Sequence, residues 1–214
     1  AAHCVAYKPN LAFYECYGID GMRALDATVD YIRSKYPEIF LIADAKRGDI
    51  GNTAKMYAKA FFEEMDFDAV TIAPYMGADS VTPFLEYKDK WAIVLALTSN
   101  ASAYQYQNAQ KDGKPLYQAV MEEMMEISTP DNMMFVVGAT KADKLQELRS
   151  FCPDNFFLVP GVGAQGGSAE EVIENGSNDH GGLLINSSRG ILFADSTENY
   201  AKVAGEVAAK TANL

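Results

Sequence analysis

Asp44, Lys46 and Asp49 form a charged string at the end of an apolar run, and this string is the feature of the sequence most suited to chemistry. The run is Phe40-Leu41-Ile42-Ala43, which is typical of a buried strand. Side chains two residues apart in an extended chain point to the same side, so Asp44 and Lys46 should project together. Lys8 ends an earlier apolar run in the same way, which favours an array of alternating cations and carboxylates. Burying such ion pairs costs desolvation, which favours a reactive site over a solvated salt bridge in a loop.

Two segments near the carboxyl end have the composition of an anion-binding site. Pro160–Gly167 is rich in glycine and precedes a helical stretch, so its backbone N–H groups and the helix N-terminus favour an anion. Ser187–Gly190 follows the next apolar run. In a barrel these loops form the phosphate site, where Gly163, Gln165 and Arg189 are expected to converge. The G-x-G-x-x-G spacing also fits a dinucleotide, with Arg189 on a 2′-phosphate, and a simple turn followed by a helix cap is the third interpretation.

Two further sets of polar residues are candidate site residues. Thr98-Ser99-Asn100 offers hydroxyl and amide groups to a planar polar ligand, although helix capping explains the same residues. His3 and His180 are the only histidines, and neither has the spacing of a metal ligand or of a Ser/His/Asp triad. We therefore expect no metal site.

The elements that must position these residues alternate along the chain. Seven apolar runs are candidate strands: Cys4–Tyr7, Phe40–Ala43, Ala69–Ala73, Ala92–Leu97, Met133–Gly138, Phe156–Val162 and Gly182–Asn186. Six stretches between or after them have helical length: Met22–Lys35, Thr53–Met65, Leu116–Ile127, Lys141–Phe151, Ala169–Asn175 and Asn199–Lys210. Strands that alternate with helices predict parallel βαβ units, in which both faces of each strand are buried.

We predict an α/β fold and, within it, a (β/α)8 TIM barrel formed by a single domain, residues 1–214. Reactive or conformationally special residues close nearly every candidate strand, and a barrel gathers those ends on one rim. An open doubly wound sheet is the alternative. Seven strands fall one short of eight, so we expect a first βα unit of ~30 or more residues to be missing from the N-terminus. Without it the chain would expose a barrel edge, and its activity is in question.

The composition restricts the partners and the compartment. Eighteen basic and twenty-nine acidic residues give a net charge of −11, which argues against nucleic acid or an anionic membrane as the main partner. Cys4, Cys16 and Cys152 show no metal-ligand spacing and suit a reducing compartment. No apolar run approaches the roughly 20 residues of a membrane span, and no leader pattern is visible. These features predict a soluble, cytoplasmic protein.

Taken in order, the motifs resemble those of the orotidine 5′-phosphate decarboxylase family, in particular its longer bacterial subgroup. The matching segments cover essentially the whole chain: Lys8-Pro9-Asn10, Asp44–Thr53, Pro74-Tyr75-Met76-Gly77, Thr98-Ser99-Asn100, Val137-Gly138-Ala139-Thr140, Pro160–Gly167 and Ser187–Gly190. Each motif is weak alone, but the ordered set is specific. The resemblance implies a lyase of pyrimidine biosynthesis that converts orotidine 5′-phosphate to uridine 5′-phosphate (UMP) and CO2 with no metal or organic cofactor.

The resemblance also implies roles for individual residues. Lys8, Asp44, Lys46 and Asp49 match the charged tetrad of the family, whose members are homodimers. Asp49 and Thr53 would be shared across the interface, together with Ile50, and would serve the site of the neighbouring subunit. The remaining substrate-binding residues implied are Ser99 at the pyrimidine edge and Pro160, Gly163, Gln165, Ser188 and Arg189 around the phosphate.

The chemistry implied by the resemblance is electrostatic. Loss of CO2 from C6 leaves a carbanion in the plane of the ring, with no π system to delocalise it. A fixed ammonium at Lys46 would stabilise that charge and then protonate C6. Two alternatives stay open: a Mg²⁺-dependent sugar-phosphate decarboxylase or aldolase of the same barrel superfamily, and a nucleotide-phosphate binding protein without turnover.

Overall fold

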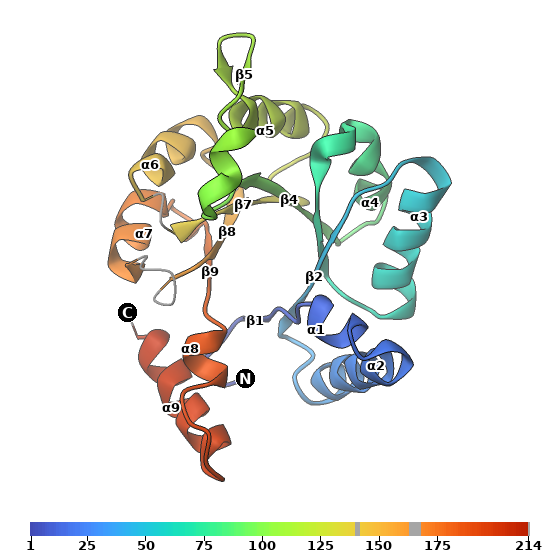
Figure 1. Cartoon of the computed structure of the whole chain (residues 1–214), viewed down its shortest axis with the longest axis vertical. Coiled ribbons are helices and arrows are strands. Elements are labelled where there is room, and N and C mark those ends of the chain that lie inside the picture. Colours follow the sequence, from blue (N-terminus) through green and yellow to red (C-terminus); the bar gives the residue numbers. More distant parts are fainter. Residues whose placement is uncertain (140–141, 163–167, 214) are drawn as a thin grey trace. The chain divides into compact units, whose positions relative to one another are not determined.

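The computed structural model describes residues 1–139, 142–162 and 168–213, and its main feature is a parallel sheet (Figure 1). Over these residues the sheet has seven strands in the order β1-β2-β3-β4-β7-β8-β9. They are β1 (Ala6–Tyr7), β2 (Phe40–Arg47), β3 (Ala69–Ile72), β4 (Trp91–Leu97), β7 (Met133–Val137), β8 (Phe156–Pro160) and β9 (Leu183–Asn186). The predicted strands are thus all present, and the predicted α/β class is confirmed.

The helices follow the predicted alternation with shifted ends. The longer ones are α2 (Gly18–Lys35), α3 (Gly51–Lys59), α5 (Leu116–Glu126), α6 (Ala142–Phe151), α7 (Ala169–Gly176) and α9 (Tyr200–Thr211). Short helical segments are α1 (Ala12–Glu15), η2 (Pro74–Met76), η3 (Ala78–Ser80), α4 (Thr82–Leu85), η4 (Ala101–Gln105) and α8 (Arg189–Leu192). The predicted helix Thr53–Met65 divides in two, because α3 is followed by a π-helical turn, η1 (Ala60–Glu64).

The chain forms two compact units, of which the first holds mainly residues His3–Leu95 and Glu126–Met133. Its strands lie on one side and its longer helices on the other (Figure 1). Helix α2 buries Leu25, Val29 and Ile32, which recur at helical spacing along one face. Its first turn packs so closely on α1 that a Cβ at Gly21 would lie 1.9 Å from the carbonyl oxygen of Tyr14.

The second unit holds mainly residues Ala96–Met125 and Met134–Leu214. Its core is formed by the fully buried side chains of Phe135, Leu145, Phe157 and Val172. A small antiparallel hairpin of β5 (Gln110–Lys111) and β6 (Lys114–Pro115) was not predicted. Its turn, Asp112-Gly113, has positive φ at both residues, which is the geometry that Asp-Gly favours in two-residue hairpins.

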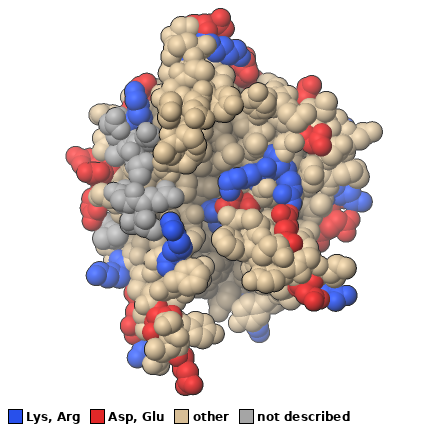
Figure 2. Space-filling model, viewed as in Figure 1, with Lys and Arg blue, Asp and Glu red and all other residues tan. Residues whose placement is uncertain are grey.

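Charged side chains of both signs are distributed over the face in view in Figure 2, where basic groups lie beside acidic ones. Within the described part of the chain, no helix is long and apolar enough to cross a membrane. Because acidic residues outnumber basic ones and the net charge is −11, any site that binds an anion must depend on a few locally placed cations.

Candidate functional site

The pairing of β1 with β2 brings Lys8 onto Asp44. Tyr7 lies beside Leu41 in the parallel register, and beyond β1 the pairing continues as an isolated bridge between Asn10 and Asp44. The Lys8 Nζ is 2.6 Å from Asp44 Oδ2, and only 12% and 8% of the two side chains are exposed. The predicted cation–carboxylate array therefore exists, with Asp44 at its centre.

Lys46 meets the same carboxylate through an irregularity in β2. Its Nζ lies 2.5 Å from Asp44 Oδ1, while half of the side chain remains exposed. Regular alternation does not produce this contact, because the register with β3 shifts between Ala43 and Arg47, and Lys46 has a φ of +47°. The predicted proximity of Asp44 and Lys46 is observed, but it depends on a bulge that redirects the lysine.

Asp44 is held as an anion by its two lysines. Burial alone would raise the pKa of this carboxyl, but the Coulombic attraction of Lys8 and the hydrogen bonds from Lys46 and Lys8 outweigh it. The net pKa is lowered below the ordinary value for aspartate. Both oxygens of the carboxylate thus accept from ammonium groups, which fixes the two cations relative to each other.

Thr71 is a further member of this cluster. The side chain, in the middle of β3, is 1% exposed, and its Oγ1 accepts the backbone N–H of Lys46 at 2.9 Å. The same Oγ1 is 3.2 Å from Asp44 Oδ1. Sequence reasoning missed it because Val70-Thr71-Ile72 is simply a β-branched strand, with no signal that the hydroxyl meets a charge.

Arg47 makes further contacts at the bulge. Its guanidinium donates to the carbonyl of Ala45 at 3.0 Å, pairs with Glu15, and lies over the rings of Tyr57 and Phe61 at 5.4 and 5.6 Å from their centroids. These rings come from α3 and from the π-helical turn after it. From the sequence, Arg47 was only an arginine next to Lys46, and nothing in its position indicated these contacts.

The last charged residue of the string lies apart from the other three. Asp49 is half-buried in the loop after β2, and its Oδ1 accepts the N–H of Ile50 at 2.8 Å. Within the described ranges no basic side chain pairs with Asp49. Ile50 and Thr53 are both exposed, at the N-cap and in the first turn of α3. The structure therefore joins Lys8, Asp44 and Lys46, whereas Asp49 stays half-buried in the loop and Ile50 and Thr53 are exposed.

In the second unit, Ser99 is fixed by a close backbone approach after β4. A Cβ at Gly138 would lie 2.7 Å from Ser99 Cβ and 2.8 Å from its backbone nitrogen, so glycine is required there. The neighbouring Thr98 exchanges two hydrogen bonds with Gln107, N–H to Oε1 at 2.9 Å and Nε2 to Oγ1 at 2.8 Å. These bonds close the loop that carries η4 and give Ser99 a defined position at the end of the strand.

The predicted phosphate residues belong to the same unit. Pro160 ends β8 beside Asn186 of β9, and Ser188 is the N-cap of α8. Arg189 begins that helix, is exposed, and has no acidic partner among the described residues. Gly163 and Gln165, like Thr140 of the Val137–Thr140 motif, lie outside the described residues.

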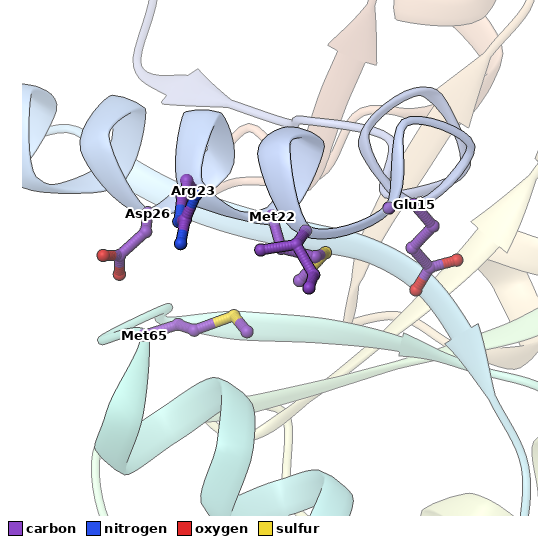
Figure 3. Close-up of a pocket in the computed structure, with 7 residues that line it drawn as sticks. Glu15, Met22, Arg23, Asp26 and Met65 are labelled. Atoms are coloured by element: carbon purple, nitrogen blue, oxygen red, sulfur yellow. The ribbon is translucent and has the colours of Figure 1, made fainter.

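A separate groove lies in the first unit beside α2 (Figure 3). Its volume is about 530 Å³. Met22 and Met65 face each other across it, and Glu15, Arg23 and Asp26 stand along its edge. Gly18 and Ile19 are the other residues that line the groove. None of the predicted site residues is among these described lining residues.

Comparisons with known proteins identify the family of the chain. The family model for orotidine 5′-phosphate decarboxylase / HUMPS matches residues 1–204. Orotidine 5′-phosphate decarboxylase from Christiangramia forsetii is 56% identical over 95% of this chain and 75% of that protein, and the protein of the same name from Phocaeicola vulgatus is 55% identical over 98% and 78%. The structure of Leishmania donovani OMP decarboxylase matches 99% of this chain and 81% of that one, with a TM-score of 0.86 and 36% identity.

These matches confirm the predicted family and the predicted (β/α)8 barrel class, of which seven strands are described here. The relatives span more than this chain does, since it covers about three quarters of their length. The model match runs through every segment that carries a predicted site residue. The chain belongs to the orotidine 5′-phosphate decarboxylase / HUMPS family.

Proposed function

We propose that this protein decarboxylates orotidine 5′-phosphate to UMP and CO2 without a metal or an organic cofactor, as the last step of UMP synthesis. The observation that carries the proposal is the Lys8–Asp44–Lys46 array, in which one buried carboxylate holds two ammonium groups. Membership of the decarboxylase family supports the same reaction.

Lys46 is the proposed proton donor. Breaking the bond between C6 and the carboxylate leaves its electron pair in the ring plane, where only an external positive charge can stabilise it. The ammonium has three N–H donors and gives one to Asp44, so the others can meet the substrate. Transfer of one proton to C6 completes UMP and leaves a neutral amine, which regains its proton from water.

Asp44 and Lys8 are proposed to hold that ammonium in place. The lowered pKa of Asp44 keeps the carboxylate ionised, so the bond to Lys46 persists at neutral pH. Lys8 anchors the other oxygen of Asp44, and its own side chain is mostly buried. A preorganised cation is worth more than one that must reorient during the reaction, because no reorganisation cost falls on the chemical step.

Substrate binding is proposed to use residues of the second unit. Ser99, fixed against Gly138, would read the edge of the pyrimidine. Arg189, which is exposed and has no acidic partner among the described residues, and Ser188 at the N-terminus of α8 would bind the phosphate with Pro160, Gly163 and Gln165. Phosphate binding remote from C6 can supply free energy for the chemical step, so loss of Arg189 should lower kcat/KM.

A homodimer that shares Asp49, Ile50 and Thr53 is part of the proposal. These residues follow Lys46 by only three to seven positions; Asp49 is half-buried in the loop, and Ile50 and Thr53 are exposed at the start of α3. A carboxylate that no described basic side chain pairs with, a hydroxyl and an apolar side chain in that position suit contact with the ribose and the surface of a second copy.

In the metal-dependent alternative, Asp44 would have to bind the metal ion instead of the two lysines. Mg²⁺ is bound through carboxylate oxygens, and both oxygens of Asp44 already accept from lysines at 2.5–2.6 Å. A divalent cation would have to displace these ammonium groups. Because both oxygens of Asp44 accept hydrogen bonds from lysines, the structure favours decarboxylation through electrostatic stabilisation by a lysine over a metal-dependent reaction.

The test is loss of the orotidine 5′-phosphate absorbance band on addition of purified protein, with and without EDTA. Lys46→Ala should abolish turnover, whereas Lys88→Ala, which removes a lysine whose side chain is 91% exposed, should not change it. Turnover that survives EDTA and depends on Lys46 supports the proposal.

Three other outcomes would contradict it. Substrate binding without turnover would favour the nucleotide-phosphate binding protein. Turnover of sugar phosphates that requires Mg²⁺ would favour the metal-dependent enzyme. Full activity in Lys46→Ala would remove Lys46 from the mechanism.

A further inference from the structure

The hydroxyl of Thr71 contacts both ends of the Asp44–Lys46 pair. Thr71 Oγ1 is 2.9 Å from the backbone nitrogen of Lys46 and 3.2 Å from Asp44 Oδ1, the oxygen that receives the Lys46 ammonium. We propose that Thr71 is a positioning residue that fixes the direction of the Lys46 side chain through this double contact. The inference rests on the proposed function and extends it to a residue that does not touch the substrate.

The strand register explains why a side chain is needed here. Ala43 pairs with Val70 and Arg47 pairs with Ile72, so the three residues 44–46 of β2 face the single residue Thr71 of β3. A bulge of this kind leaves backbone groups outside the regular ladder. The N–H of Lys46 is one of them, and the Thr71 hydroxyl accepts it in place of a backbone carbonyl.

The backbone of Lys46 also requires support. Its φ of +47° is a conformation that a residue with a Cβ rarely adopts, and it persists only where the surroundings determine it. A hydrogen bond to the N–H of that same residue favours the unusual geometry directly. Because this geometry sets the direction of the Cα–Cβ bond, it determines where a half-exposed ammonium can reach.

The hydrogen-bonding capacity of the hydroxyl makes the contact specific. A threonine hydroxyl has one proton and two lone pairs. One lone pair accepts from Lys46, and the proton can go to Asp44 Oδ1 at 3.2 Å or to the carbonyl of Ala43 at 3.5 Å. The nearer acceptor is also the charged one, and charge-assisted bonds are the stronger ones. The hydroxyl therefore adds a third donor to a carboxylate that otherwise faces Lys8 and Lys46.

Thr71→Val tests the proposal, since valine keeps the shape and removes the hydroxyl. We expect kcat to fall about tenfold to a hundredfold, the range that a small misplacement of a reacting group produces, with a KM change below about threefold. Thr71→Ser keeps the hydroxyl and should restore kcat to within about threefold of the wild type. The control is Thr28→Val, which removes an exposed hydroxyl bonded to Ala24 in α2 and should leave kcat and KM unchanged.

A second measurement needs no turnover. A carboxyl carbon NMR titration of Asp44 in the free protein should give a higher midpoint in Thr71→Val than in the wild type, because one donor to the ionised form is lost. Thr71→Ser should keep the wild-type midpoint. If Thr71→Val does not fold, Thr71→Ala, which adds no volume, carries the same two expectations.

The outcomes separate this inference from the proposed function. A wild-type protein that does not decarboxylate orotidine 5′-phosphate contradicts the function, while the titration still reports on the contact. Wild-type kcat and an unshifted Asp44 midpoint in Thr71→Val would refute the positioning role. A loss of kcat in Thr71→Ser alongside wild-type kcat in Thr71→Val would also refute it, because it would show that the methyl packing matters and the hydroxyl does not.

Discussion

The Nζ of Lys8 lies 2.6 Å from Oδ2 of Asp44, although 36 positions separate the two residues in the sequence. The backbone sets this contact, because the N–H of Asp44 donates to the carbonyl of Pro9 at 3.1 Å and the N–H of Leu11 donates to the carbonyl of Asp44 at 3.2 Å. The segment that follows β1 is therefore joined to the middle of β2 through both backbone groups of Asp44.

Replacing Lys8 with methionine should destabilise the protein strongly. The substitution keeps the apolar stem and leaves a buried carboxylate with only one of its two cations, so we expect a loss of about 3 kcal/mol in the free energy of unfolding. Urea unfolding measures it. Lys88→Met is the matched control, because Lys88 and Asp89 are 3.9 Å apart with side chains 91% and 83% exposed, and it should leave the free energy within error. Equal effects of the two substitutions would contradict a buried array.

The lowered pKa of Asp44 predicts a specific loss of stability in acid. Because the folded-state pKa lies below the unfolded one, the ionised carboxylate contributes its full stability above the unfolded pKa, about 4, and loses it as pH falls through the folded value. The difference in unfolding free energy between wild type and Asp44→Asn should therefore shrink from pH 5 to pH 3. For the exposed Asp89→Asn the difference should stay small throughout. A wild-type advantage over Asp44→Asn that does not change with pH would show that the pKa is not lowered.

The strands and most helices could be predicted because their signal is local. Apolar runs such as Met133–Gly138 and Phe156–Val162 are buried on both faces of a parallel sheet, and the observed strands begin at the same residues and end one or two residues earlier. The β5–β6 hairpin also had a local signal, the Asp112-Gly113 pair, which went unused. The π-helical turn after α3 had no such local signal, because its apolar residues have the spacing of an ordinary α-helix.

The candidate site was predictable in composition and less so in geometry. Asp44 and Lys46 stood out because charges are rare at the end of a buried strand. Thr71 and Tyr57, which contact Lys46 and Arg47, did not stand out, since they come from other elements and meet the bulge only after the sheet forms. Such contacts are set by register and by a backbone conformation at Lys46 that no propensity favours.

Gly138→Ala should impair substrate binding through Ser99. The new Cβ would lie 2.7–2.8 Å from Ser99 Cβ and its backbone nitrogen, and backbone cannot yield as a flexible side chain can. We expect overpacking to cost about 1–3 kcal/mol of stability and KM for orotidine 5′-phosphate to rise about tenfold or more as Ser99 is displaced.

Gly205→Ala is the control for this substitution. No atom lies within 4 Å of the new Cβ, and Gly205 is inside α9, so the change should stabilise the protein by about 0.5–1 kcal/mol and leave KM unchanged. Unfolding curves and steady-state kinetics measure both variants. Unaltered KM in Gly138→Ala would remove Ser99 from the proposed pyrimidine contact.

Replacing Arg149 with lysine should loosen the second unit locally. The guanidinium donates to five backbone carbonyls at 2.7–3.1 Å and lies 4.0 Å over the ring of Phe157; the carbonyls are those of Cys152, Pro153, Asn155, Gly176 and Gly182. Lysine keeps the charge but has no planar fork, so several carbonyls lose their donor, and we expect a destabilisation of about 3 kcal/mol. Hydrogen exchange should accelerate at the Phe157 amide, which donates to Gly182, while Leu41 of β2 should not change. Arg23→Lys, at an arginine 77% exposed, is the control, and protection of Phe157 that survives in Arg149→Lys would show that the fork does not hold β8 to β9.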